Sequence, residues 1–180
     1  MTTVGTNTAT VRAMPRRLYT DAERARRDAT PWTLVQGVLA PLQFVVFLIS
    51  LTLVLRYLWT GAGYEAATLS IIVKTGVLLV IMVTGAIWEK VVFGQYLFAP
   101  AFFWEDVFSF AVIALHTFYL YGLWTGALDP MAQMAVALAA YATYVLNAGQ
   151  FIWKLRLARL DAAAEDEASE VRRMVEGVAA

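Results

Sequence analysis

The sequence contains no cysteine and only one histidine among its 180 residues. The lack of cysteine excludes disulfide bonds, thiolate metal sites and cysteine nucleophiles. A single histidine excludes a bis-histidine haem within one chain and zinc sites of the common type. Charge is scarce too, because charged residues make up 16% of the chain, against about 25% in a typical soluble domain. The 14 basic and 14 acidic residues balance, so overall charge indicates no nucleic-acid partner.

Hydrophobic residues, by contrast, make up 60% of the chain and collect in four long runs. A helix needs about 20 apolar residues to cross a hydrocarbon layer about 30 Å thick, and each run is close to that length. Backbone polar groups in lipid must be satisfied within the segment, so the runs predict helices. The fold class predicted is an all-α integral membrane protein with a four-transmembrane-helix bundle. The predicted helices cover residues 34–58, 66–87, 107–124 and 131–153.

The positions of Lys and Arg predict the orientation of the bundle. Arginines precede the first run and basic residues follow the fourth, whereas the short connections at 60–65 and 125–130 contain neither. The positive-inside rule therefore predicts that both termini are cytoplasmic, N-in/C-in.

Three regions follow from this reading. Residues 1–31 lack the apolar core of a signal peptide and are predicted to be a cytoplasmic polar tail. Residues 32–157 form the predicted transmembrane domain, and residues 158–180 a cytoplasmic charged helix or tail. Within the tails we predict disorder at 1–12, a short polar helix at 18–29, and a solvated helix or a partner surface at 161–176.

The connection between the second and third runs is unusually aromatic. Residues 88–106 read WEKVVFGQYLFAPAFFWED, which is too apolar for a solvated loop, and Pro100 prevents one continuous helix. We predict an interfacial or re-entrant segment at the cytoplasmic headgroup level. An ordinary aromatic belt is one interpretation, but so many aromatic residues favour a binding surface for a flat hydrophobic ligand. They are Trp88, Phe93, Tyr96, Phe98, Phe102, Phe103 and Trp104.

Polar residues recur at helical spacing inside three of the runs. A buried polar side chain is costly in lipid, so each is a candidate functional residue. For Gln and Ser, hydrogen bonding between helices is the favoured interpretation. Arg56 and Lys74 are predicted to reach outward, with Glu65 as a partner. The stripes, predicted to face each other, are Gln36, Gln43, Ser50 and Tyr57, then Glu105, Ser109, His116 and Tyr119, and then Tyr144, Asn147, Gln150 and Lys154.

Three carboxylates bracket the aromatic segment, where the positive-inside rule favours basic residues. Asp106 opens the third helix, so stabilisation by the helix dipole explains it without any chemistry. For Glu89 and Glu105, acid–base chemistry and a structural role are equally supported. His116 lies about 16 Å along the helix from Glu105. Its open roles are a packing hydrogen bond, an axial ligand to a metallated tetrapyrrole, and a proton carrier.

Three stretches carry a family resemblance: RARRDATPWTLVQGVLAPLQF at 24–44, VTGAIWEKVVFGQYLFAPAFFWEDVFS at 83–109, and ALHTFYL at 114–120. They resemble the 3-vinyl bacteriochlorophyllide hydratase family of photosynthetic bacteria, over about residues 20–157. The resemblance implies hydration of the C3 vinyl group of chlorophyllide a, or of its bacteriochlorin counterpart, to a 1-hydroxyethyl group. It also implies a carbon–oxygen lyase of bacteriochlorophyll biosynthesis in the bacterial inner photosynthetic membrane.

Hydration of a conjugated vinyl group needs an acid and a base but no redox cofactor, and we predict no cofactor. The acid protonates the terminal carbon, and water then attacks the cation on the inner carbon. Glu89, Glu105 and Asp106 are the predicted catalytic residues, because apolar aromatic walls keep a carboxyl protonated.

The remaining predicted residues bind the substrate rather than react with it. Lys90 is a candidate partner for the substrate propionate, and His116 for an axial contact with the substrate magnesium. No protein-bound metal is predicted. The other predicted substrate-binding residues are Trp88, Phe93, Tyr96, Phe103, Trp104, Tyr144 and Asn147.

A non-catalytic pigment-binding or photosystem-assembly membrane protein is the main alternative. It would use the aromatic segment and His116, but it has no need for three clustered carboxylates. A small transporter or quinone-reactive subunit is disfavoured, because the sequence has neither an inverted repeat nor further histidines. The predicted partners are a tetrapyrrole, water and the bilayer, with a second copy or other pigment-biosynthesis enzymes as further candidates.

Overall fold

The computed structural model describes residues 18–178, apart from the side chains of residues 165 and 166, and this part of the chain forms five helices. They are α1 (Asp21–Ala29), α2 (Pro31–Thr60), α3 (Tyr64–Phe93), α4 (Phe103–Thr125) and α5 (Pro130–Val178). The last four are long and apolar enough to cross a membrane, which confirms the predicted four-helix bundle. The disorder predicted for residues 1–12 lies outside the described residues.

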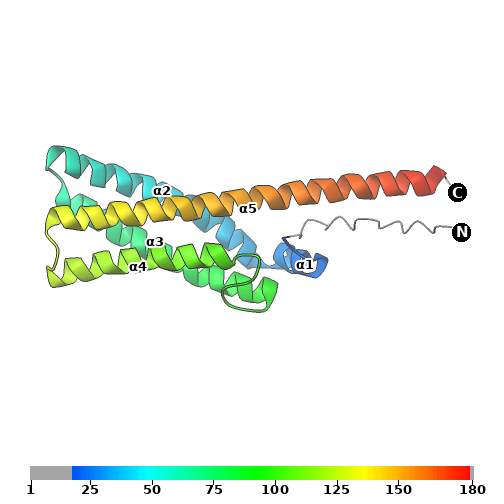
Figure 1. Cartoon of the computed structure of the whole chain (residues 1–180), viewed down its shortest axis with the longest axis horizontal. Coiled ribbons are helices and arrows are strands. Elements are labelled where there is room, and N and C mark those ends of the chain that lie inside the picture. The colour runs from blue at the N-terminus through cyan, green and yellow to red at the C-terminus, as the bar shows by residue number, and fades with distance from the viewer. Residues whose placement is uncertain (1–17, 179–180) are drawn as a thin grey trace, which may run out of the picture.

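Figure 1 shows how the helices are arranged. The α2–α3 and α4–α5 connections lie at one end of the bundle, and α1 lies with the α3–α4 connection at the other. We call this second end the α1 end. Helix α5 continues past it as a single helix. The helix predicted at 161–176 is therefore confirmed as part of α5, while its role as a partner surface stays a prediction.

Local sequence signals explain where the helices begin and end. Thr20 and Glu23 form a capping box at the start of α1, with a bond of 2.7 Å from the Thr20 N–H to the Glu23 carboxylate. Thr30 caps α2, and Pro31 occupies its first turn. Gly94 ends α3 in the left-handed conformation, at φ 84°, which glycine adopts without strain. The short polar helix predicted at 18–29 is thus confirmed as α1.

Helix α2 packs along α3, and α4 packs along α5. Polar stripes of neighbouring helices meet inside the bundle, as predicted. Asn147 of α5 donates to Ser109 of α4 at 2.8 Å. Ser50 of α2 lies 2.5 Å from the hydroxyl of Tyr141 of α5, which is outside the predicted stripes. The apolar core around them includes Phe47, Val54, Ile71, Leu78, Val112, Tyr119, Met134 and Tyr141.

The outward orientation predicted for Lys74 is wrong. Its side chain is fully buried, and its amine lies 3.1 Å from Nε2 of His116. The same amine lies 4.3 Å from the ring centroid of Tyr144 and 5.3 Å from that of Tyr141. Lys74 lies about 15 Å along α3 from its start, so the imidazole and the aromatic faces stabilise the amine where the aqueous edge is too distant.

Candidate active site

The three predicted catalytic carboxylates come together at the α1 end. Glu89 lies near the end of α3, and Glu105 and Asp106 lie in the first turn of α4. Their side chains are buried, with 5%, 4% and 4% of their surfaces exposed. The carboxyl groups of Glu89 and Asp106 are neighbours, because the backbone N–H groups of two consecutive residues, Ala99 and Phe98, donate to them. The structure therefore places an acid pair, rather than isolated carboxylates, beneath the aromatic segment.

Lys154 of α5 pairs with the third carboxylate. Its amine lies 2.5 Å from Oε2 of Glu105, also donates to the carbonyl of Ala101, and lies 4.8 Å from the ring centroid of Phe102. The spacing of polar residues predicted Lys154 at the base of a polar stripe but not in the site. The signal that could have identified Lys154 as a site residue is that its stripe was predicted to face the stripe that contains Glu105.

The charges of this cluster indicate where a proton resides. Glu105 is balanced by Lys154, whereas neither Glu89 nor Asp106 forms an ion pair with a Lys or Arg among the described residues. Two ionised carboxylates close together repel each other, which favours one shared proton in such a pair. Asp106 also accepts from the Phe98 N–H at 2.6 Å, and Glu89 from the Ala99 N–H at 3.2 Å. The pair can therefore both donate and accept a proton.

Residues 94–102, which we call the strap, connect α3 to α4 and cover the carboxylates. The polar anchors already described bind the strap at Phe98, Ala99 and Ala101. Phe98 adopts φ 59°, a left-handed conformation that is strained for a bulky residue. Its ring stacks on Phe110, with centroids 5.5 Å apart and an interplanar angle of 10°. The carboxylates thus hold the strap in place as well as forming the acid pair.

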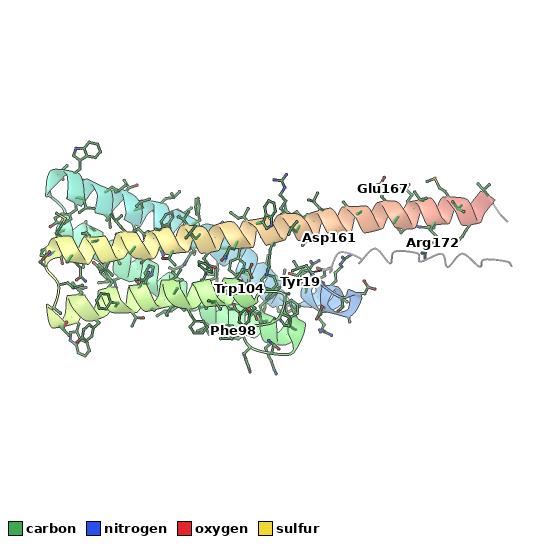
Figure 2. The ribbon with its side chains drawn as sticks, viewed as in Figure 1. Tyr19, Phe98, Trp104, Asp161, Glu167 and Arg172 are labelled. Carbon is green, nitrogen blue, oxygen red and sulfur yellow. The ribbon has the colours of Figure 1, made fainter. Side chains whose placement is uncertain are left out.

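The predicted aromatic residues divide into two groups. An inner cluster surrounds Phe102, which contacts Trp88 edge-on at 5.6 Å and stacks on Phe151 at 6.0 Å between centroids. Phe93 and Tyr19 complete this cluster. The second group is exposed, and Figure 2 labels two of its members, Phe98 and Trp104, at the α1 end. We call it the aromatic rim: Tyr96, Phe98, Phe103 and Trp104, with 60%, 39%, 44% and 64% of their surfaces exposed.

The other predicted binding residues lie at different depths. Lys90 is exposed and donates to the Gly94 carbonyl at 2.7 Å, beside the rim. Asn147 and Tyr144 lie deeper, on the face of α5 that meets α4 and α2. His116 lies deeper still, with Nδ1 2.8 Å from the Val112 carbonyl and Nε2 beside Lys74. Both ring nitrogens thus have partners within the bundle, and contact with a substrate magnesium stays a prediction.

Tyr19 belongs to the site although the sequence did not predict it. It is buried at 6% exposure, stacks on Phe93 at 5.7 Å, and lies 4.8 Å beneath the Arg27 guanidinium. Burial raises the pKa of Tyr19 from 10.0 to about 12. Arg26 secures α1 further by donating to the Val92 carbonyl at 2.8 Å. Helix α1 therefore covers the inner aromatic cluster, although the polarity of its sequence predicted only a short helix within a cytoplasmic tail.

Among the described residues, no group of three or more His, Asp or Glu side chains is arranged to hold a metal ion. The groups gathered at this site are the acid pair, the Glu105–Lys154 pair and the aromatic rim.

Comparison with known proteins gives one consistent result. A family model described as 2-vinyl bacteriochlorophyllide hydratase (BCHF) matches residues 19–157. A relative of that name from Rhodobacter capsulatus is 76% identical over 149 residues, which cover 83% of this chain and 86% of the relative. Another from Cereibacter sphaeroides is 76% identical over 146 residues, covering 81% and 91%. No solved structure matches the chain significantly.

Proposed function

We propose a function from the finding that this chain belongs to the 2-vinyl bacteriochlorophyllide hydratase family. In this proposal, Glu89 and Asp106 form the catalytic acid–base pair of the enzyme. The chain is a multi-pass membrane enzyme that adds water to a vinyl group of a tetrapyrrole in bacteriochlorophyll biosynthesis. The observation that supports the pair is that two buried carboxyls accept from consecutive backbone N–H groups, next to a third carboxyl that is already paired with lysine.

The proton of the pair belongs on Glu89 in the resting enzyme. Asp106 receives the shorter backbone hydrogen bond, 2.6 Å against 3.2 Å, and lies in the first turn of α4, where the helix dipole stabilises an anion. Glu89, at the end of α3, has no such dipole in its favour. Glu89 is therefore the acid in this proposal, and Asp106 is the base.

The proposed reaction consumes one water and leaves the protein unchanged. Glu89 gives its proton to the terminal vinyl carbon, and the positive charge that forms on the inner carbon spreads into the macrocycle. Water forms a C–O bond with that inner carbon and loses a proton to Asp106. The proton then passes from Asp106 to the neighbouring carboxylate of Glu89, which restores the starting state. Glu105 and Lys154 are positioning residues here, because they hold the strap and the charge balance without touching the alkene.

The aromatic rim is the proposed binding site of the macrocycle. Its exposed rings lie at the α1 end beside Lys90, whose ammonium is available for the substrate propionate. We assign this end to the cytoplasmic face of the photosynthetic inner membrane, and the reacting group to the C3 vinyl of chlorophyllide a or its bacteriochlorin counterpart. Only 4–5% of the surface of these carboxylate residues is exposed, so the strap blocks access to them. The vinyl group therefore reaches the carboxyls only when the strap moves.

The test is hydration of chlorophyllide a by membranes that contain the protein, followed by mass spectrometry for a product heavier by one water. Replacement of Glu89 by Gln is expected to lower the rate at least about 100-fold, because general acid catalysis contributes at least that factor. Glu65→Gln is the matched control, since Glu65 is an exposed carboxylate at the other end of the same helix. Full activity of Glu89→Gln would disprove the acid assignment, and binding without product would favour a pigment-binding protein.

A further inference from the structure

Several polar atoms inside the bundle have no hydrogen-bond partner among residues 18–178. Gln43 of α2 is 2% exposed, and neither atom of its amide is paired. Asn147 of α5 is 8% exposed, and its Oδ1 is unpaired although its Nδ2 donates to Ser109. Oε1 of Gln150, one turn further along α5, is also buried and unpaired. Unpaired polar atoms are costly in an apolar interior, so this group of amides is suited to a small polar ligand.

Contacts between the helices place these amides at one level. The ring of Phe47 packs on that of Tyr144 at 5.0 Å between centroids. Gln43 lies one turn from Phe47, and Asn147 lies about one turn from Tyr144, both in the direction of the α1 end. Gln43 and Asn147 therefore lie at similar depth on facing helices.

The same level adjoins the acid pair. Ser109, which accepts from Asn147, follows Asp106 by three residues on α4, and residues at this spacing share a helical face. The amides thus lie about one helical turn, or about 5 Å, inward of the Asp106 carboxylate. The strap closes the opposite side of that carboxylate.

We propose that Gln43, Ser109 and Asn147 form an internal water-binding site that supplies the hydrating water to Asp106. A buried water needs two to four polar partners, and the amide of Gln43, the hydroxyl of Ser109 and Oδ1 of Asn147 provide both donors and acceptors. The inference rests on the proposed function. In each turnover the bound water breaks one O–H bond, forms the C–O bond with the inner vinyl carbon and gives its proton to Asp106.

An internal water molecule would meet one requirement of the proposed hydration, which is that water must be present when the cation forms. The hydrophobic macrocycle on the aromatic rim excludes bulk water from the acid pair at the moment when a cation forms beside it. A water held inward of Asp106 is already oriented by its partners, so it attacks without diffusing past the ring.

Hydroxyl-radical footprinting of the purified full-length protein tests whether water is there, because radicals generated from bound water oxidise the side chains around it. Phe47 and Tyr144 are the reporters, since both are buried and border the proposed site. We expect both to be labelled in the wild type and to lose the label in Gln43→Met. Gln36→Met is the matched control. It makes the same change seven residues earlier on α2, where the Gln36 amide is already bonded to Thr84 at 2.8 Å.

Steady-state kinetics tests whether this water reacts. Gln43→Met is expected to lower kcat about tenfold with KM unchanged, through loss of a pre-positioned reactant, and Gln36→Met is expected to retain both values. Wild-type protein without label at Phe47 and Tyr144 would overturn the proposal, as would a fully active Gln43→Met enzyme. Footprinting needs no turnover, so a fully active Glu89→Gln enzyme with the label intact would instead reject the acid–base assignment.

Discussion

The carboxylate of Asp106 accepts a hydrogen bond of 2.6 Å from the backbone N–H of Phe98, whose φ of 59° lies in the left-handed region. The base proposed for the reaction is thus also the group that holds the strap in a strained conformation. When Asp106 takes up a proton it becomes a weaker acceptor, and its hold on Phe98 weakens. The strap is therefore expected to loosen when the proton has arrived, which is when the product must leave.

Replacing Phe98 by Gly or by Ala separates the backbone strain from the ring. Both variants lose the stacking on Phe110, but only Gly adopts the positive φ without strain. Phe98→Gly is expected to be more stable than Phe98→Ala by about 1 kcal/mol, as measured by thermal unfolding in detergent. Equal stability of the two variants would show that the left-handed conformation is not retained.

Replacing Asp106 by Asn separates catalysis from support of the strap. Asn keeps an oxygen that accepts from Phe98 but cannot take up a proton at neutral pH, so the hydration rate is expected to fall at least about 100-fold. Asp106→Ala loses both functions, and proteolysis within the strap is expected to speed up in this variant alone. An active Asp106→Asn enzyme would assign the base elsewhere.

Lys154→Met is expected to leave Glu105 buried without a cation. Loss of one partner from a buried ion pair typically costs about 3–5 kcal/mol, and the 22% exposure of Lys154 places the expected loss at the low end, about 3 kcal/mol. The double variant Lys154→Met, Glu105→Gln should regain most of this stability, because no buried charge is left. Chemical denaturation of all three proteins measures the difference. A double variant no more stable than the single one would argue against the ion pair.

Alkaline pH is expected to detach α1 through Tyr19. Burial raises the folded pKa of Tyr19 to about 12 from 10.0, so the folded state retains a proton that the unfolded state loses. The contribution to stability is therefore complete below pH 10 and is lost as the pH rises to 12, by about 2–3 kcal/mol in total. Tyrosinate absorbance and Trp88 fluorescence follow the change. In the Tyr19→Phe variant, the Trp88 fluorescence should not change between pH 10 and pH 12. If the variant responded as the wild type does, Tyr19 would be excluded as the cause.

His116→Gln tests whether the histidine contacts the substrate magnesium. Both imidazole nitrogens are engaged, with Lys74 and with the Val112 carbonyl, so the bound pigment is expected to have the same absorption spectrum in the variant. Stability should fall by about 1–3 kcal/mol, because the buried Lys74 amine loses its partner. A shifted spectrum would instead support axial ligation.

The sequence by itself determined the properties that depend on local segments. Four apolar runs of spanning length can only be helices in lipid, because each must satisfy its own backbone. Thr20 and Gly94 set helix ends through capping geometry between near neighbours. The spacing of Ser109 and Asn147 placed them on faces that do meet. The unusual aromatic segment was sufficient to identify the family and to draw attention to Glu89, Glu105 and Asp106.

Only the tertiary structure decided which of these groups touch. The path of the strap brings Glu89 against Asp106, and the packing of α5 on α4 assigns Lys154 to Glu105 rather than to either of the others. Lys74 turned inward because His116, 42 residues away, offered its amine a partner. Hydropathy and spacing describe one helix at a time, whereas the protonation of a carboxyl depends on charges and donors that other helices bring within a few ångströms.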